Sequence, residues 1–233
     1  MPKKPATVHR FDSLEAKGFE IRFFGHAKSI IRGEFAEALF DIGGALSKTI
    51  DGVPRESTSH EVDHVKRYDA GVIAMEIEWN NKDPFFDRDL ENFKRLHAEG
   101  AVSVGVLVTR GASLQDALWK AVRRFAHVRN IGSFEDLLAN GYSPTSKQRD
   151  NVLERVRRDK DPKAFADAWT DNFVSNKFGQ ATTHWTKLMH RVDRGVGNPC
   201  PLLLIGLPAS IISFDAAPIE QLSEDDSKSG GAP

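Results

Sequence analysis

Two acidic residues interrupt residues 72–79 (VIAMEIEW), a segment that otherwise has the composition of a β-strand. Acidic side chains are poor strand formers, and Glu76 and Glu78, two positions apart, point to the same face of a strand. The preceding segment HEVDHVK is a second candidate strand, and the turn-forming sequence RYDAG joins the two into an antiparallel hairpin. Counting outward from a turn centred between Asp69 and Ala70 places Asp63 opposite Glu76.

Three carboxylates at the same end of a hairpin repel one another strongly unless a cation lies between them. Mg²⁺ prefers hard oxygen ligands, so the pattern of Asp63, Glu76 and Glu78 indicates a magnesium site. The alternative is that these side chains are simply solvated on an exposed sheet face, which is the commoner situation for acidic residues in such hairpins. Asp69 competes as the third carboxylate, but an aspartate in a turn is expected for local hydrogen bonding.

The segments around the hairpin predict a mixed α/β sheet flanked by helices, because strand-like and helix-like patterns alternate along the chain. Ser113 is the expected N-cap of one helix, and Thr182 or Thr183 that of another. The predicted strands cover residues 19–26, 60–66, 72–79, 101–111 and 201–207, and the predicted helices cover 27–46, 87–100, 113–128, 146–173 and 183–192.

Composition excludes several classes of protein. The net charge of −1 means that any surface for nucleic acid must be local. A single cysteine, Cys200, excludes an intramolecular disulfide and suits a reducing cytoplasm, and no run approaches the ~18 apolar residues that span a membrane. We therefore expect a cytoplasmic protein without a membrane partner, with an acidic, disordered tail over residues 217–233.

The residues of the hairpin also carry a family resemblance. An acidic residue on one strand followed by E-x-(K/E/Q) on the next is the pattern of PD-(D/E)xK nucleases. The stretch HEVDHVKRYDAGVIAMEIEWNNKDPFFDRDLENFKRL, the strand SVGVLVTRG and the later NKFGQATTHWTKLMHRVDRGVGNPCPLLLIG resemble the BglII/BamHI-like branch of type II restriction endonucleases. The resemblance spans roughly residues 35–207. It implies a restriction-endonuclease-like core, a mixed β-sheet flanked by helices on both faces, in a single domain over residues 1–216.

This resemblance implies that Asp63, Glu76 and Glu78 are catalytic, and that Asp63, Glu76 and the main-chain carbonyl of Ile77 bind the metal. Glu78 stands where most of the superfamily has lysine. A glutamate can bind metal or accept a proton but cannot stabilise negative charge, so both roles stay open. Glu37, on the predicted helix 27–46, is a further candidate ligand, against the alternative of a solvated helix side chain.

The implied activity is that of a type II site-specific deoxyribonuclease that uses Mg²⁺ to cut double-stranded DNA. A palindromic site implies a homodimer, because cutting both strands requires two active sites related by a two-fold axis. The helix 27–46 is a candidate dimer element.

Two segments are candidates for DNA contact. NNKD follows Glu78 directly, and SNKFGQ, expected to be a loop, offers side chains suited to base edges. In the helix after it, a buried stripe is expected from Trp185, Leu188, Met189 and Val192. A basic, exposed stripe is expected from His184, Lys187, Arg191 and Arg194. The DNA-binding candidates are Asn80, Asn81, Lys82, Asn176, Lys177, Gln180, Thr182, Thr183, His184, Lys187, Arg191 and Arg194, nine of them in a recognition segment over residues 176–194.

Two other functions are compatible with the same carboxylates. The chain is then either a PD-(D/E)xK repair or structure-specific nuclease, or a DNA-binding relative that has kept the fold and lost catalysis.

Overall fold

The structure is a computed structural model that describes residues 14–25, 62–69 and 71–214. The described chain divides into two compact units. The first, here called the sheet unit, contains the described residues up to 112 together with 183–208, and the second, the helical unit, contains 113–182 and 209–214. The expectation of a single domain over residues 1–216 stays a prediction, because compactness alone does not say which part folds independently.

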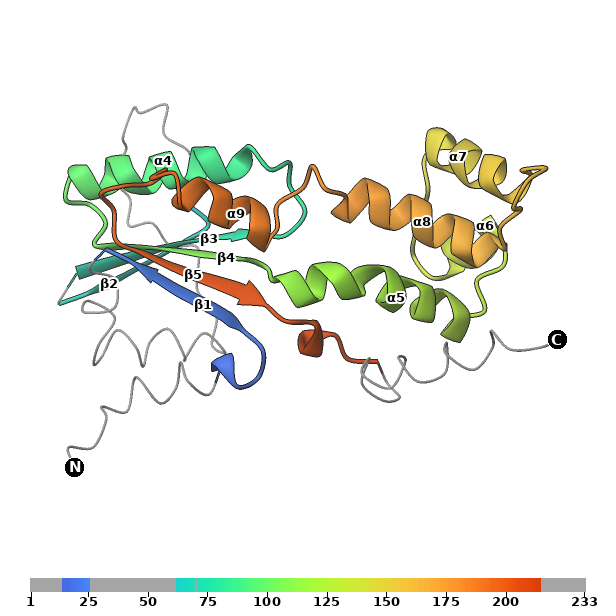
Figure 1. Ribbon diagram of the computed structural model, residues 1–233, viewed down its shortest axis with the longest axis horizontal. Helices are drawn as coiled ribbons and strands as arrows, with labels where there is room; N and C mark the ends of the chain where they lie inside the picture. The colour runs from blue at the N-terminus through green and yellow to red at the C-terminus, as the bar shows by residue number, and fades with distance from the viewer. Residues whose placement is uncertain (1–13, 26–61, 70, 215–233) are drawn as a thin grey trace. The chain divides into compact units, whose positions relative to one another are not determined.

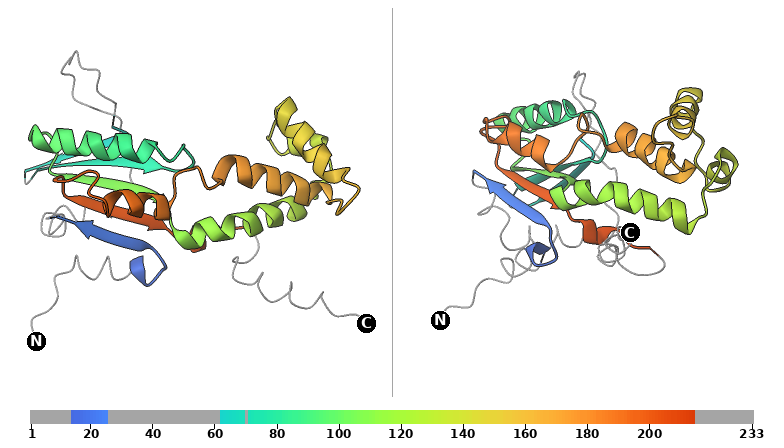
Figure 2. Two further views of the ribbon diagram at one scale, coloured as in Figure 1. Left: turned by 45° about the horizontal axis from the view of Figure 1, so that its top comes forward. Right: turned by 45° about the vertical axis from the view of Figure 1, so that its right-hand side comes forward.

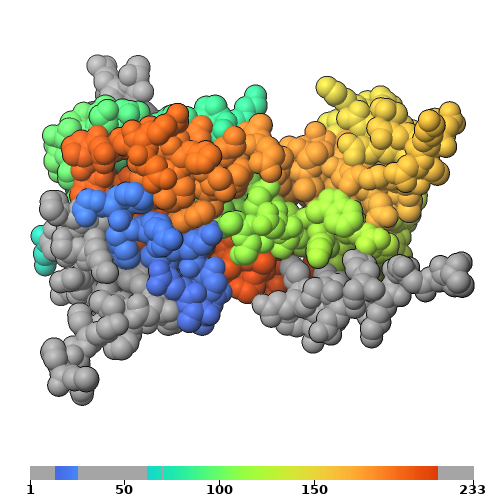
Figure 3. Space-filling model, in the orientation of Figure 1, coloured from blue at the N-terminus to red at the C-terminus, as the bar shows by residue number. Residues whose placement is uncertain are grey.

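The sheet unit contains a five-stranded mixed sheet in the order β1-β5-β4-β3-β2 (Figure 1). The two edge strands pair antiparallel with their neighbours, whereas β3, β4 and β5 run parallel in the centre. The edge strand β1 forms part of the surface seen in Figure 3. The strands are β1 (Glu20–Phe24), β2 (His64–Tyr68), β3 (Gly71–Glu78), β4 (Val104–Arg110) and β5 (Leu202–Leu207).

Two helices, α4 (Phe85–Ala98) and α9 (Trp185–Val192), cover one face of this sheet (Figures 1 and 2). Each helix has apolar residues at helical spacing, and these meet Ala74, Leu107 and Leu204 of the sheet in one buried cluster. On α4 the buried stripe is Phe86, Leu90 and Phe93, and on α9 it is Trp185, Leu188 and Val192, with Met189 partly buried beside them. The stripe predicted from Trp185 to Val192 is confirmed.

The opposite face of the sheet carries a second buried cluster, which includes Ile73, Met75, Val104, Val106 and Leu203. Strands β3 and β4 are therefore apolar on both faces, as expected for the inner strands of a parallel arrangement. The predicted mixed α/β sheet with flanking helices is confirmed. The predicted helix 27–46, the candidate Glu37 and the tail 217–233 lie outside the described residues.

The helical unit contains four α-helices and a short 3₁₀ helix in its described part: α5 (Ala112–Val128, whose first residue belongs to the sheet unit), α6 (Phe134–Ala139), α7 (Ser146–Val156), α8 (Phe165–Phe178) and η1 (Ala209–Ile211). Trp169 of α8 packs in its core against Phe125, Tyr142 and Phe173. Ser113 is not an N-cap, because α5 already begins at Ala112, and its hydroxyl instead accepts a hydrogen bond from the Ala209 N–H. No helix in the described part of the chain is long and apolar enough to cross a membrane.

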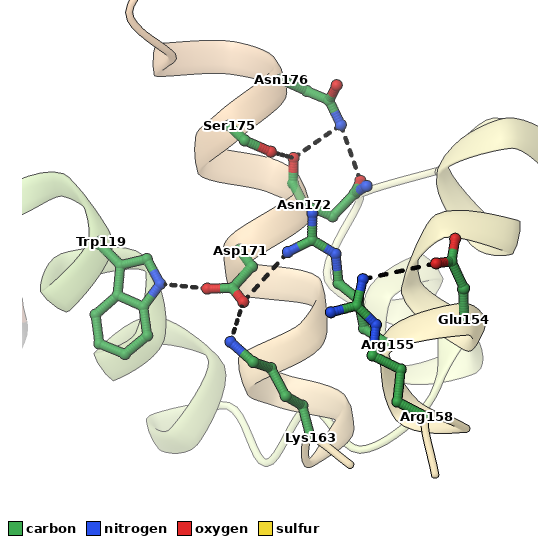
Figure 4. A network of polar contacts seen from close by, with 9 residues as sticks. All are labelled: Trp119, Glu154, Arg155, Arg158, Lys163, Asp171, Asn172, Ser175 and Asn176. Carbon is green, nitrogen blue, oxygen red and sulfur yellow. Dashed lines mark hydrogen bonds and ion pairs between the residues drawn. The ribbon is translucent and has the colours of Figure 1, made fainter. Parts of the chain in front are cut away.

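A charged network on Asp171 ties three parts of the helical unit together (Figure 4). The Asp171 carboxylate accepts hydrogen bonds from the indole N–H of Trp119, at 2.7 Å, and from the Lys163 ammonium, and Arg155 lies at 3.2 Å. Burial favours the neutral form of Asp171, but the hydrogen bonds from Lys163 and Trp119 and the two positive charges outweigh it, so its pKa is lowered.

We expect Asp171→Asn to lower the free energy of unfolding by about 1.5 kcal/mol at pH 7, because the charge-assisted hydrogen bonds are lost. A lowered pKa means that this contribution is present above the ordinary value of 3.8 and is lost as the pH falls below it. Chemical denaturation at pH 7 and pH 3 measures the difference between variant and wild type. Asp150→Asn, on the exposed surface of α7, is the control. An equal loss at both pH values contradicts an electrostatic origin.

Candidate active site

The hairpin of β2 and β3 has the register counted from the sequence. His64 pairs with Met75 and Val65 with Ala74, so Asp63, just before β2, lies beside Glu76. The Asp63 N–H donates a hydrogen bond to Glu76 Oε2, at 3.3 Å, and the Ile77 N–H donates one to Asp63 Oδ2, at 3.1 Å. The two carboxylates are therefore held together by the backbone of both strands.

Glu76 is almost fully buried, with 1% of its surface exposed. It lies on the face of the sheet that α4 covers, because it alternates with Met75 and shares the orientation of Ala74. Burial raises the pKa of Glu76 to about 8, and the negative charges of Asp89 and Asp63 add to the effect. At neutral pH, without a cation, the site therefore favours a proton on this carboxyl.

Glu78 is also buried, with 2% of its surface exposed, and two side chains hold it in place. The Asn81 side-chain amide donates to Glu78 Oε2 at 2.9 Å, and an Arg88 nitrogen lies 3.6 Å from Oε1. Burial is the main cause that raises the pKa of Glu78 to about 7, with the neighbouring Asp89 contributing in the same direction, while Asn81 and Arg88 oppose it. A carboxylate with this pKa is suited to accept a proton near neutral pH.

The structure adds a fourth carboxylate that sequence reasoning missed. Asp89 of α4 has no exposed surface, and it interacts with both Glu76 and Glu78. The adjacent Arg88 donates to Asp89 Oδ1 from Nε, at 2.9 Å. One signal in the sequence pointed to Asp89: it lies three residues after Phe86 and beside Leu90, on the stripe of α4 that faces the sheet.

The atoms available at this site are of the chemical type that a hard divalent cation prefers. Asp63, Glu76 and the Ile77 carbonyl offer only oxygen atoms, and burial raises the pKa of the Glu76 carboxyl to about 8, a shift that a nearby cation would oppose. Within residues 14–25, 62–69 and 71–214, however, no three histidine, cysteine or acidic side chains are already gathered as a complete metal site. A cation bound here would require these oxygen atoms to move closer together.

Arg110, at the end of β4, connects the segment after Glu78 with the segment before α9. Its side chain is fully buried, and it donates to the carbonyl oxygens of Trp79, at 2.7 Å, and Thr183. The Thr183 N–H in turn donates to the Asn81 carbonyl at 2.8 Å. Burial lowers the pKa of Arg110 to about 10, so it stays charged at neutral pH. This network fixes the position of Asn81 beside Glu78.

The same network changes the expected role of the start of α9. Thr183 and His184 are buried, and His184, not a threonine, is the N-cap, without a side-chain capping hydrogen bond. The predicted caps Thr182 and Thr183 are therefore wrong. The physical reason is that Arg110 and Asn81 already hold the Thr183 backbone, while Thr182 uses its hydroxyl on the Gly179 carbonyl.

The basic stripe predicted on α9 is only partly exposed. Arg191 is buried and pairs with Asp87 at 2.9 Å and Asp83 at 3.5 Å, and Lys187 lies 3.5 Å from Asp83. Arg194 is exposed. The expectation of a wholly solvent-facing basic stripe is wrong, because acidic residues of the chain before and within α4 neutralise two of its members.

The remaining DNA-binding candidates lie in different settings. Asn80, Asn81 and Lys82 are exposed and follow Glu78 directly. Asn176 and Lys177 belong to the last turns of α8, not to a loop, because the buried Phe178 extends the helix to Gly179. The Asn176 amide donates to the side chain and the carbonyl of Asn172. Gln180 is exposed, Thr182 is buried, and DNA contact by any of these residues stays a prediction.

Comparison with known proteins identifies the family. The model of the restriction endonuclease BglII/BglIII family matches residues 44–207. No curated protein and no solved structure matches the chain. The matched segment contains the hairpin, α4 and the network around Arg110. Because the match covers well over half of the 233 residues, this chain belongs to the BglII/BglIII family of restriction endonucleases, type II enzymes that cleave double-stranded DNA at specific sequences.

Proposed function

We propose that this protein is a Mg²⁺-dependent site-specific deoxyribonuclease that hydrolyses one phosphodiester bond in each strand of a short palindromic DNA site. The observation that carries the proposal is the end of the β2–β3 hairpin in a chain of this family, where Asp63 lies beside Glu76 and Glu78 follows on the same face of β3. Two of the three carboxylates are buried with raised pKa values, which is unfavourable for stability and typical of a functional site.

In this proposal Asp63, Glu76 and the Ile77 carbonyl bind the metal ion, since they supply hard oxygen ligands. When bound, Mg²⁺ lowers the pKa of a coordinated water and offsets negative charge on the scissile phosphate. Glu78 accepts the proton of the attacking water, because its pKa of about 7 suits a general base near neutral pH. Asn81 keeps the Glu78 carboxylate oriented through its hydrogen bond to Oε2.

The DNA contacts are proposed for five exposed members of the candidate set. Asn80 and Lys82 lie directly after the catalytic strand, so they suit the backbone next to the cleaved bond. Lys177, Gln180 and Arg194 are exposed and suit phosphate or base contacts. Thr182, Thr183, His184 and Arg191 are buried, and Lys187 and Asn176 have partners within the protein, so these six serve DNA binding only by shaping the surface or after rearrangement.

We propose that the active form is a homodimer. One chain carries one set of Asp63, Glu76 and Glu78, and a palindromic duplex presents two equivalent bonds on opposite strands. A two-fold axis that relates two chains places one site at each bond.

Incubation of the purified protein with plasmid DNA and Mg²⁺ tests the function. We expect discrete bands whose sequenced ends share one short palindrome, and no cleavage after chelation of the metal. A smear would instead identify a nuclease without sequence preference, and intact DNA that is still bound would identify an inactive relative. Sedimentation with and without duplex DNA tests the dimer.

A further inference from the structure

The guanidinium of Arg88 lies at the edge of the proposed active site and is held on one side only. Its Nε and Nη2 contact Asp89 Oδ1 at 2.9 and 2.8 Å, and Nη2 lies 3.6 Å from Glu78 Oε1. The guanidinium also lies over the ring of Phe85, 4.2 Å from its centroid. Asp89 has no exposed side-chain surface, so this end of the Arg88 side chain has a firmly fixed partner.

The other edge of the guanidinium is open. Within the part of the chain that the structure describes, no acceptor is bonded to Nη1, and the Arg88 side chain is 38% exposed. The guanidinium of an arginine is rigid and planar. When a carboxylate binds one edge of it, the orientation of the N–H groups on the other edge is therefore fixed as well. The open donors of Arg88 therefore belong to a partly exposed side chain next to Glu78, so they are available to a phosphate that enters the proposed active site.

The chemistry of the site requires a positive charge at this place. Glu76, Glu78 and Asp89 are three buried carboxylates, and a phosphodiester adds a further negative charge that grows in the transition state. A metal ion bound at Asp63 and Glu76 would offset part of this negative charge, but Glu78, which is itself acidic, cannot offset any of it. Among the described residues, Arg88 is the cation in contact with both Glu78 and Asp89.

We propose that Arg88 donates hydrogen bonds to the scissile phosphate and stabilises the negative charge that develops on it during cleavage. Asp89 is the positioning residue that holds Arg88 in this orientation. The inference rests on the proposed nuclease function and assigns to it a residue from α4, outside the hairpin. The competing explanation is that Arg88 only neutralises Asp89 and Glu78 within the folded protein, without touching DNA.

The test uses Arg88→Met and Arg88→Lys in the full-length protein. Arg95→Met is the matched control, because Arg95 is an exposed arginine two turns further along α4 that pairs with Glu99. Two quantities are measured for each variant: the single-turnover cleavage rate with Mg²⁺, and the salt dependence of DNA affinity with Ca²⁺ in place of Mg²⁺. Thermal unfolding confirms that each variant is folded.

For Arg88→Met we expect the cleavage rate to fall by about 10²–10³-fold, the usual loss for one donor to a transition-state oxyanion. We expect DNA affinity to fall by less than about tenfold, with a slope of log affinity against log salt that is smaller by about one unit, as for one lost phosphate contact. Arg88→Lys, which keeps the charge but not the fork, should recover part of the rate, and Arg95→Met should match wild type.

A salt slope for Arg88→Met equal to that of wild type overturns the proposal, because a purely structural role leaves phosphate contacts unchanged. A cleavage rate for Arg88→Met within threefold of wild type overturns it as well. These outcomes differ from failure of the proposed function itself, in which the wild-type protein does not cut DNA in Mg²⁺.

Discussion

Replacing Asp63 with asparagine is expected to lower the single-turnover rate of DNA cleavage by at least about 10³-fold, the equivalent of several kcal/mol of metal-dependent stabilisation. Asparagine keeps the size of the side chain and an acceptor oxygen for the Ile77 N–H, but it removes the negative charge that binds a cation. Because Asp63 is exposed, the fold should tolerate the change, with an effect on unfolding free energy of about 0.5 kcal/mol or less. Cleavage is measured on a linear duplex that contains the site mapped from the digest.

The matched control is Asp69→Asn, the same substitution at an exposed aspartate at the other end of the hairpin, in the turn. We expect this variant to cut within threefold of the wild-type rate. If Asp69→Asn abolished cleavage and Asp63→Asn did not, the assignment of the catalytic carboxylates would be wrong, even though the register of the hairpin is as described.

Replacing Glu76 with glutamine is expected to have two opposite effects. Cleavage should again fall by at least about 10³-fold, because a buried carboxylate of the metal site is lost. In a chelating buffer at pH 8, the variant should nevertheless be more stable than wild type, with a free energy of unfolding higher by about 2–4 kcal/mol. Its unfolding temperature should be higher accordingly. Glutamine has nearly the same shape but no charge, so the cost of protonating this carboxyl on folding, or of burying it ionised, disappears.

The pH dependence of this gain follows from the raised pKa. The folded state holds a proton on Glu76 up to about pH 8, whereas an unfolded glutamate loses it near 4.5. The stability of the wild-type protein therefore falls as the pH rises through this window, and the glutamine variant lacks this contribution. The difference between the two should be small at pH 4.5 and largest at pH 8.

Metal binding gives a second measurement on the same pair of proteins. Mg²⁺ should raise the unfolding temperature of wild type, because a ligand that binds only the folded state stabilises it, and should leave Glu76→Gln nearly unchanged. Glu91→Gln, on the exposed side of α4, is the control and should behave as wild type in both respects. A Glu76→Gln protein that is less stable than wild type at pH 8 in chelator would contradict the unfavourable burial of this carboxyl.

The hairpin was predictable because its geometry is local. A turn sequence, a strand period of two and the antiparallel register together placed Asp63 beside Glu76, and the structure has this register. The apolar stripes of α4 and α9 were predictable for the same reason, since the period of a helix fixes which residues share a face. These relations depend on residues close in sequence, and the fold has little freedom to change them.

The environment of the carboxylates was not predictable in this way. Asp89 and Arg88 meet Glu78 only because α4 packs across the carboxyl end of β3, and the sequence does not state the rotation of a helix on a sheet to the accuracy of a hydrogen bond. Similarly, the sequence predicts that Arg191 is an exposed basic residue, but in the structure it is buried and pairs with Asp87 and Asp83.

The sequence by itself therefore determined the family pattern, the succession of strands and helices along the described part of the sheet unit, and the three carboxylates at the end of the hairpin. Only the tertiary structure decided that Glu76 and Glu78 are buried and that Asp89 of α4 joins them. It also decided that Arg88 contacts both Glu78 and Asp89. The physical reason is that burial and charge pairing depend on which distant segments pack together, whereas register and helical stripes depend on backbone periodicity alone.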